Sequence, residues 1–215
     1  MVVKISIVTD KSSWINAYIP TLRAQLQKKG HGVRWIHDDH HVQQGDLAFY
    51  LSYGKIVGRA ILQRNTHNLV VHESDLPKGK GWSPVTWQVL KGRKRIPVTL
   101  FEAVEALDAG PIYLKTTFAL EGHELIDEIR RLQAEKTLAL CTSFVQRYPG
   151  IVKQATPQRG RSTFYARRRA EDSRLDPRRS LRAQFNLLRV VDNEKYPAFF
   201  EFRRHRYRLA IAKIP

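Results

Sequence analysis

The chain has 215 residues, 42% of them hydrophobic, which is enough for one domain with a buried core and a small appendage. Residues 2–8 alternate like a strand, no apolar run reaches the roughly 18 residues of a membrane span, and Cys141 is the single cysteine, so we expect a cytoplasmic protein without disulfides or thiolate metal cages. The 37 Lys and Arg against 20 Asp and Glu give a net charge of +17, which predicts an anionic partner without identifying it.

Short apolar runs bounded by polar turns predict a sheet interleaved with helices. The predicted strands are 2–8, 33–36, 47–51, 68–72 and 96–101, and the predicted helices are 13–29, 85–90 and 125–146. This alternation is typical of the α/β class, with a Rossmann-like, mostly parallel sheet. Ligands of such sheets bind beyond the carboxyl ends of the strands. Pro149 and Gly150 end the long helix, so we place a domain boundary there, between 1–150 and 151–215.

The remainder predicts a small, basic α+β module. Residues 158–182 are rich in arginine, and Asp176 with Pro177 predicts the start of a helix with Leu181 and Leu188 on its apolar face. Residues 198–202 and 207–211 predict a β-hairpin around 203–206. Aromatic residues on that hairpin leave a homodimer open.

Two polar loops carry the candidate chemistry. The first is HESDLPKGKGWSP at 72–84, and the second is LDAGPI at 107–112. His72 ends a predicted strand, and Asp108 lies in a predicted turn. Each residue alone is typical of a core or turn position. If both loops border the same sheet, however, the imidazole and the carboxylate come within reach of each other, and such a pair moves protons near neutral pH.

The pattern H-x-S-x-L-P-x-x-x-G-x-x-P followed by D-A-G-P-I resembles the formyltransferase family that uses 10-formyltetrahydrofolate, whose members include glycinamide ribonucleotide, methionyl-tRNA and amino-sugar formyltransferases. The resemblance covers about the first 145 residues, and YGKIV at 53–57 is similar to the family's folate-pocket strand. It implies His72 and Asp108 as catalytic residues. The folate-binding residues it implies are Lys55, Ile56, Val57, Val104, Leu107 and Asp108. The loop residues it implies for acceptor binding are Ser74, Lys78, Lys80 and Trp82.

One position departs from the family pattern. The family has an asparagine two residues before the histidine, which donates to the developing oxyanion, and this chain has Val70 there. Asn68 is a poor substitute because four strand residues place it roughly 13 Å from His72. Protonated His72 or a backbone N–H in the next loop remain as candidate donors, and a weakened or inactive enzyme stays open.

The segments 164–176 and 187–199 resemble the tail of amino-sugar formyltransferases. That resemblance implies sugar-nucleotide contacts by Arg167, Asn186, Arg189 and Tyr196. Arginine guanidinium groups bind phosphate oxygens with two hydrogen bonds, which would suit a sugar nucleotide. A basic face exposed to solvent explains the arginine-rich segment equally well. The favoured function is therefore formyl transfer from 10-formyltetrahydrofolate to a nucleotide-linked 4-amino-4,6-dideoxy sugar in bacterial surface-glycan synthesis.

Two other functions stay open. A methionyl-tRNA-type formyltransferase would use the basic surface for phosphate contacts, although such enzymes carry a larger C-terminal domain than the residues after 150. A non-catalytic RNA-binding module on a retired formyltransferase fold would explain Val70. We expect a sugar-nucleotide substrate rather than nucleic acid, and no membrane partner. Residues 37–41, HDDHH, predict a solvated loop in preference to a metal site.

Overall fold

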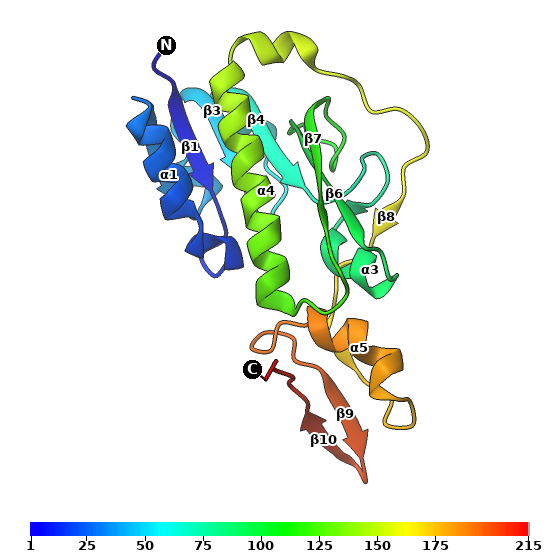
Figure 1. Ribbon diagram of the computed structural model, residues 1–215. Helices are drawn as coiled ribbons and strands as arrows, with labels where there is room; N and C mark the ends of the chain where they lie inside the picture. Colours follow the sequence, from blue (N-terminus) through cyan, green and yellow to red (C-terminus); the bar gives the residue numbers. More distant parts are fainter. Residues whose placement is uncertain (215) are drawn as a thin grey trace.

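A six-stranded sheet forms the centre of the computed structural model, which describes residues 1–214 (Figure 1). Its strands, in spatial order, are β2 (Gly32–Ile36), β1 (Lys4–Val8), β3 (Gly45–Tyr50), β4 (Asn65–His72), β6 (Arg95–Glu102) and β7 (Ile112–Ala119). The first four are parallel, and β6 and β7 are antiparallel. The predicted α/β class with a mostly parallel sheet is confirmed. Strand β7, however, was not among the strands predicted from the sequence.

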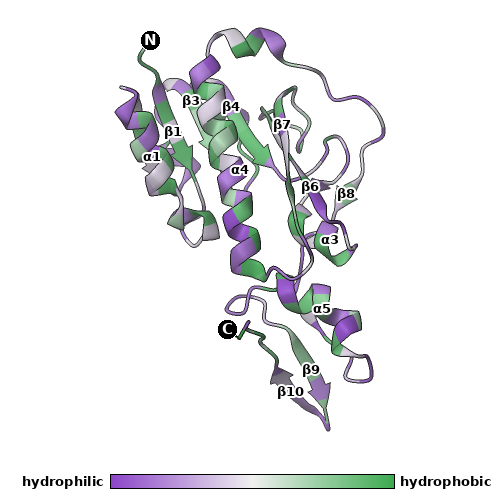
Figure 2. Cartoon of the chain, viewed as in Figure 1, coloured by the Kyte–Doolittle hydropathy of each residue, from purple (hydrophilic) through white to green (hydrophobic). Residues whose placement is uncertain are grey.

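Helices cover both faces of the sheet. On one face α1 (Ile19–Lys28) and α4 (Ile126–Arg147) enclose the larger core, whose fully buried residues include Phe49 and Phe144. On the other face α2 (Arg59–Leu62) contributes Ile61 to a smaller cluster with Tyr50. Figure 2 shows the mixed polar and apolar surface of α4, as expected for a helix with one buried side. None of the described helices combines the length and the apolar character that crossing a membrane requires.

The predicted helix 13–29 is in fact two elements. Trp14–Ala17 forms a 3-10 turn, and α1 begins afterwards with Pro20 in its first turn. Proline fits that position because its fixed φ suits a helix start and the missing N–H has no partner there in any helix.

The segment after α4 stays on the sheet domain. A 3-10 helix, Gly150–Gln154, follows α4, and Thr156 bridges to Ile112 at the start of β7. Further on, β8 (Phe164–Tyr165) pairs in parallel with β5 (Lys80–Gly81), just before α3 (Pro84–Leu90). The chain therefore continues along the first domain beyond the predicted boundary at Gly150, because backbone pairing to β7 and β5 holds it there.

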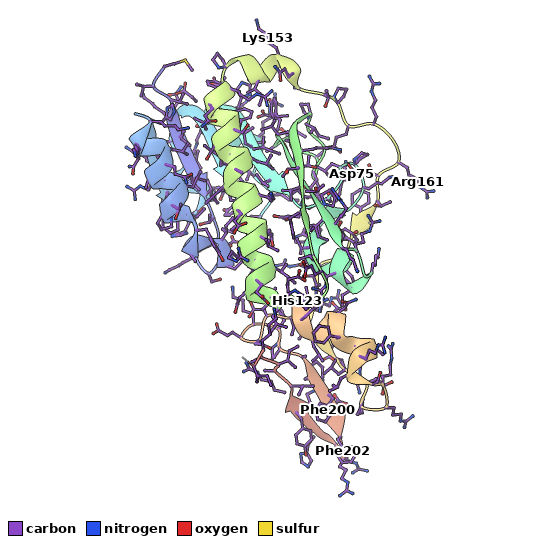
Figure 3. The ribbon with its side chains drawn as sticks, in the orientation of Figure 1. Asp75, His123, Lys153, Arg161, Phe200 and Phe202 are labelled. Carbon is purple, nitrogen blue, oxygen red and sulfur yellow. The ribbon has the colours of Figure 1, made fainter. Side chains whose placement is uncertain are left out.

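The small module begins near Leu175, whose N–H donates to Phe199 O. It contains α5 (Leu181–Val190), β9 (Phe199–Phe202) and β10 (His205–Arg208) around their own apolar cluster. Figure 3 labels Phe200 and Phe202 on this hairpin, at the end away from the sheet domain.

Both predicted boundaries in the module need correction. Helix α5 starts at Leu181, after Ser180 as N-cap, because the Asp176 side chain instead accepts from Arg178 N and closes a turn. The hairpin turn is tighter than predicted. Arg203 and Arg204 both have positive φ, 49° and 68°, so a two-residue turn connects the strands.

A buried ion pair joins the module to the sheet domain. The Arg189 side chain is 3% exposed, and its Nη1 lies 3.3 Å from Oε2 of Glu124, which precedes α4. Nη1 also donates to Glu124 O, and Nε donates to Asn186 Oδ1 at 2.9 Å. A second pair, Arg130 with Asp192 at 2.7 Å, lies beside it. These contacts hold α5 against the end of α4.

We expect Arg189→Met to lower the free energy of unfolding by about 3 kcal/mol, because the buried Glu124 carboxylate loses its cation. Urea denaturation measures this. Arg131→Met is the matched control, since Arg131 forms an exposed pair with Glu135 on α4 and should cost at most about 1 kcal/mol. Equal losses in the two variants would contradict a linking role for Arg189.

Candidate active site

A cavity of about 490 Å³ opens where the parallel strands end. Its wall combines residues that follow β1 and β3, the end of β4, the loop between β6 and β7, one face of α4 and residues 190–196 of the module. In Figure 1 the arrowheads of β1 and β4 point toward the module, so the cavity lies between the two units of the chain. This is the place that the sequence predicted for ligands of such a sheet.

His72 is the last residue of β4 and is 6% exposed on the cavity wall. Its Nε2 lies 2.8 Å from Gly79 O and 3.8 Å from Asp108 Oδ2. A carbonyl oxygen can only accept a hydrogen bond, so Nε2 carries a proton. The structure therefore brings the two predicted catalytic side chains together, with a protonated ring nitrogen between two oxygens.

Asp108 is held in place by its own turn and by the opposite loop. It has a positive φ of 47°, and its Oδ2 accepts from Gly81 N at 2.8 Å. Gln158 Nε2 donates to Asp108 O and Gly110 O. A Cβ on Gly110 would lie 1.8 Å from Glu102 O, so only glycine lets this turn close against β6. The motif D-A-G-P thus encodes a close backbone contact.

The loop carrying Asp108 reaches His72 by a route that the sequence did not predict. We expected both loops to lie at the same edge of a parallel sheet. Because β6 is antiparallel to β4, Glu102 lies beside Leu69, and Ala103 N donates to Asn68 O, well before the end of β4. The loop must therefore run forward along β4 before Asp108 meets His72.

A short strand that the sequence reasoning missed holds the first loop. Thr163 Oγ1 accepts from Gly79 N at 2.8 Å, and Trp82 N donates to Tyr165 O. A Cβ on Gly81, whose φ is +98°, would lie 2.4 Å from Tyr165 O. We call residues 163–166 the strap. The two motif glycines were the signal for it, because a backbone approaching this closely requires glycine.

The predicted folate-binding residues all line the cavity: Lys55, Ile56, Val57, Val104, Leu107 and Asp108. The segment 53–57 is a loop after β3 and not the strand that the resemblance implied. Gly54 N donates to Asp10 Oδ2, and Tyr53 Oη donates to Asp39, so side chains replace strand pairing as its support.

The predicted acceptor-binding residues divide into two groups. Trp82, Arg167 and Tyr196 line the cavity. The residues that lie outside its wall are Ser74, Lys78, Lys80, Asn186 and Arg189. Ser74 and Lys80 are buried, Lys78 is exposed on the loop, and Asn186 is bonded to Arg189 at the domain junction.

Val70 lines the cavity at the position where the resemblance implies asparagine. Asn68 does not replace it, because its Nδ2 donates to Leu62 O away from the site. The side-chain oxyanion donor of the family is therefore missing at this position. The N–H group at His72 Nε2 lies in the same site, where it donates to Gly79 O.

Glu73 is a site residue that the sequence reasoning did not select. Its exposed surface lies in the cavity, next to His72. Burial is the largest influence on its carboxyl and raises the pKa, while His72 and a hydrogen bond with Gln133 lower it less. The net shift is upward from the ordinary value of 4.5.

The segment 37–41 forms a structural turn. Atoms of Asp38, Asp39 and His40 lie within 4.8 Å of one another, but Asp38 accepts from His40 N and Asp39 accepts from Tyr53 Oη. Asp39 is buried, so the segment is not the fully solvated loop that was predicted.

Comparison with known proteins gives one family. A family model described as "Formyl transferase" matches residues 5–152. A methionyl-tRNA formyltransferase of Thermotoga neapolitana is 28% identical over 155 residues, which cover 71% of this chain and 50% of that protein. The chain spans about half the length of the curated relatives it matches.

Three solved structures share the fold. HypX from Aquifex aeolicus in complex with tetrahydrofolic acid has a TM-score of 0.84 at 17% identity, covering 98% of this chain and 38% of that one. A methionyl-tRNA formyltransferase from Clostridium thermocellum has a TM-score of 0.80 at 21% identity, covering 99% and 93%. A 4-N formyltransferase from Francisella tularensis has a TM-score of 0.75 at 15% identity, covering 99% of both chains.

We expect Glu73→Gln to gain stability relative to the wild type as pH rises above about 4.5. With a raised pKa, the folded wild type binds more protons than the unfolded chain above that pH, so its stability falls until the folded pKa is passed, whereas glutamine does not titrate. The Tm difference between variant and wild type, measured from pH 4 to pH 8, checks this. Glu135→Gln, exposed on α4, should show no comparable trend; a flat difference for Glu73→Gln would contradict the burial of its carboxyl.

Proposed function

The chain belongs to the formyl transferase family, and on that basis we propose that it moves a formyl group from 10-formyltetrahydrofolate to the amine of a nucleotide-linked amino sugar. The observation that carries the proposal is the His72–Asp108 pair, 3.8 Å apart inside a cavity and held by Gly79 and Gly81. The acceptor we favour is a 4-amino-4,6-dideoxy sugar of the kind used in bacterial surface glycans.

The cavity suits a folate as the donor substrate. Ile56 and Val104 are 61% and 40% exposed, an unfavourable state for apolar side chains that a flat aromatic ligand would relieve. Both lie on the wall with Leu107, while Lys55 offers a cation for a carboxylate of the ligand. The structural neighbour HypX binds tetrahydrofolic acid on the same fold, which supports this assignment.

The chemistry is a single acyl transfer. A neutral amine attacks the formyl carbon, and the oxygen of that carbon becomes negative as the new bond forms. We assign the donor role to His72 Nε2–H, which must exchange its bond with Gly79 O for one with this oxygen, in place of the amide expected at position 70. Asp108 accepts the proton that the attacking nitrogen loses, because its carboxylate is kept beside the ring by Gly81 N–H. Tetrahydrofolate leaves as the second product.

A sugar nucleotide fits the remaining wall. Trp82 and Tyr196 offer aromatic surface, and Arg167 offers a cation for phosphate oxygens. The likeness of the fold to that of a sugar N-formyltransferase from Shewanella, with a TM-score of 0.72 at 12% identity over 99% of this chain and 98% of that one, supports a sugar acceptor.

The second candidate is formyl transfer to methionyl-tRNA. The net charge of +17 and the name of the Thermotoga relative favour it. A non-catalytic RNA-binding module is the third, and Val70 is the feature that favours it.

The first experiment follows tetrahydrofolate release from 10-formyltetrahydrofolate with UDP- and dTDP-linked amino sugars and with methionyl-tRNA as acceptors. We expect release with one amino sugar and its loss in His72→Ala. Release with methionyl-tRNA alone would support the second candidate, in which methionyl-tRNA is the acceptor. No release, combined with RNA binding that falls steeply with salt, would favour the binding module.

We expect Asp108→Asn to lower kcat by about 100-fold or more while changing the Kd for the folate by less than about 3-fold, because the lost group acts in proton transfer. Steady-state kinetics and calorimetric titration measure the two. Asp75→Asn is the control, since Asp75 lies in the same motif loop but forms an exposed pair with Lys115, and its kcat should stay within about 2-fold. Equal losses in kcat and binding for Asp108→Asn would argue against its role.

A further inference from the structure

We propose that Glu73 takes the first proton from the acceptor's ammonium group, so that the amine meets His72 and Asp108 as a neutral nucleophile. The inference rests on the proposed function and adds a residue that neither the motif nor the family pattern assigns.

The position of Glu73 places it on the acceptor side of the cavity. Side chains alternate along β4, so Val70 lies against the cluster of Val57 and Phe101, whereas Val71 belongs to the core under α4. Glu73 directly follows the end of β4 and lines the cavity together with Gln133 of α4, which acts to lower the pKa of the Glu73 carboxyl. Val57, one of the predicted folate-binding residues, packs instead in the cluster with Val70.

The acceptor side is also where the module closes the cavity. Arg130 and Gln133 of α4 line it together with Asp192, Lys195 and Tyr196 of the module. A nucleotide-linked amine bound there would present its nitrogen between Glu73 and the His72–Asp108 pair, since all three residues line the same cavity.

The reaction needs two proton acceptors. An aliphatic amine is protonated in neutral water, and its lone pair is free only after one proton leaves. In the first step the ammonium N–H bond breaks and its proton forms an O–H bond on the Glu73 carboxylate, giving R–NH₂ and a neutral acid. In the second, nitrogen bonds to the formyl carbon, the bond from that carbon to the folate N10 breaks, and the nitrogen's second proton passes through Asp108 and His72 to N10.

The proton balance of the whole reaction requires one proton acceptor in addition to His72 and Asp108. An ammonium and a formyl donor become a formamide, tetrahydrofolate and one free proton. Asp108 and His72 return the second proton to the leaving group, so they are not available for the first. Glu73 holds that first proton and releases it to water after product leaves.

The charges around Glu73 suit this exchange. The charged groups that act on it are His72 from β4 and Asp108 from the loop after β6. Arg130 of α4 is neutralised by Asp192, and from α3 the uncharged Gln88 donates to Glu73 O. Because burial raises the pKa of Glu73, the neutral acid and neutral amine are favoured over a buried ion pair.

The test is the pH profile of kcat/KM for the amino-sugar acceptor, in wild type and in Glu73→Gln. We expect a loss of about 100-fold near pH 7 that shrinks to less than about 10-fold near pH 9, where more of the amine is already neutral. A residue with a purely structural role would cause the same loss at every pH. A constant deficit, or no deficit at pH 7, would overturn the proposal. Glu135→Gln on α4 is the control and should follow the wild-type profile.

A second measurement separates this inference from the proposed function. Infrared difference spectra of the protein without acceptor should show a carboxylic acid band that titrates above the ordinary glutamate value of 4.5 and disappears in Glu73→Gln. A Glu73 that titrates at its ordinary value would overturn the proton-acceptor role, even in an active enzyme. A wild type that formylates no amine, with the infrared band present, would instead overturn the proposed function, and this inference with it.

Discussion

The pairing between the motif loop and the strap is the contact on which the site depends. Thr163 and Tyr165 hold the backbone of Gly79 and Gly81, and those two glycines in turn bind the two candidate catalytic side chains, Gly79 O with His72 and Gly81 N with Asp108. Removing the strap would release both partners at once. A two-residue strand far along the chain therefore determines the geometry of residues in the two motif loops.

The module takes part in the site because buried and half-buried ion pairs fix its position. Arg189 with Glu124 and Arg130 with Asp192 join α5 and the following loop to the end of α4. Asp192 and Tyr196 consequently lie on the cavity wall. Breaking a buried pair leaves an uncompensated charge, so this arrangement resists separation of the two units. His123 lies at the same junction in Figure 3.

The site contains one amide fewer and one carboxyl more than the family pattern implies. Val70 removes a donor from the cavity wall near His72, and Glu73 adds an ionisable group to the same cavity directly after β4. Val70 affects how the negative charge on the formyl oxygen is stabilised, and Glu73 affects the protonation of the acceptor amine.

The sequence alone determined the α/β class, the family, the C-terminal end of β4 and, to within one residue, both ends of α4, because periodicity, turn residues and motif spacing are local properties. It also selected His72 and Asp108 and the folate-side residues that the structure brings to one cavity. Tertiary structure decided what depends on long-range pairing: the antiparallel β6 and β7, the strap, the position of Arg189 at the junction and the place of Glu73 on the cavity wall. Contacts of this kind join residues far apart in the chain, and no local pattern records which of them will meet.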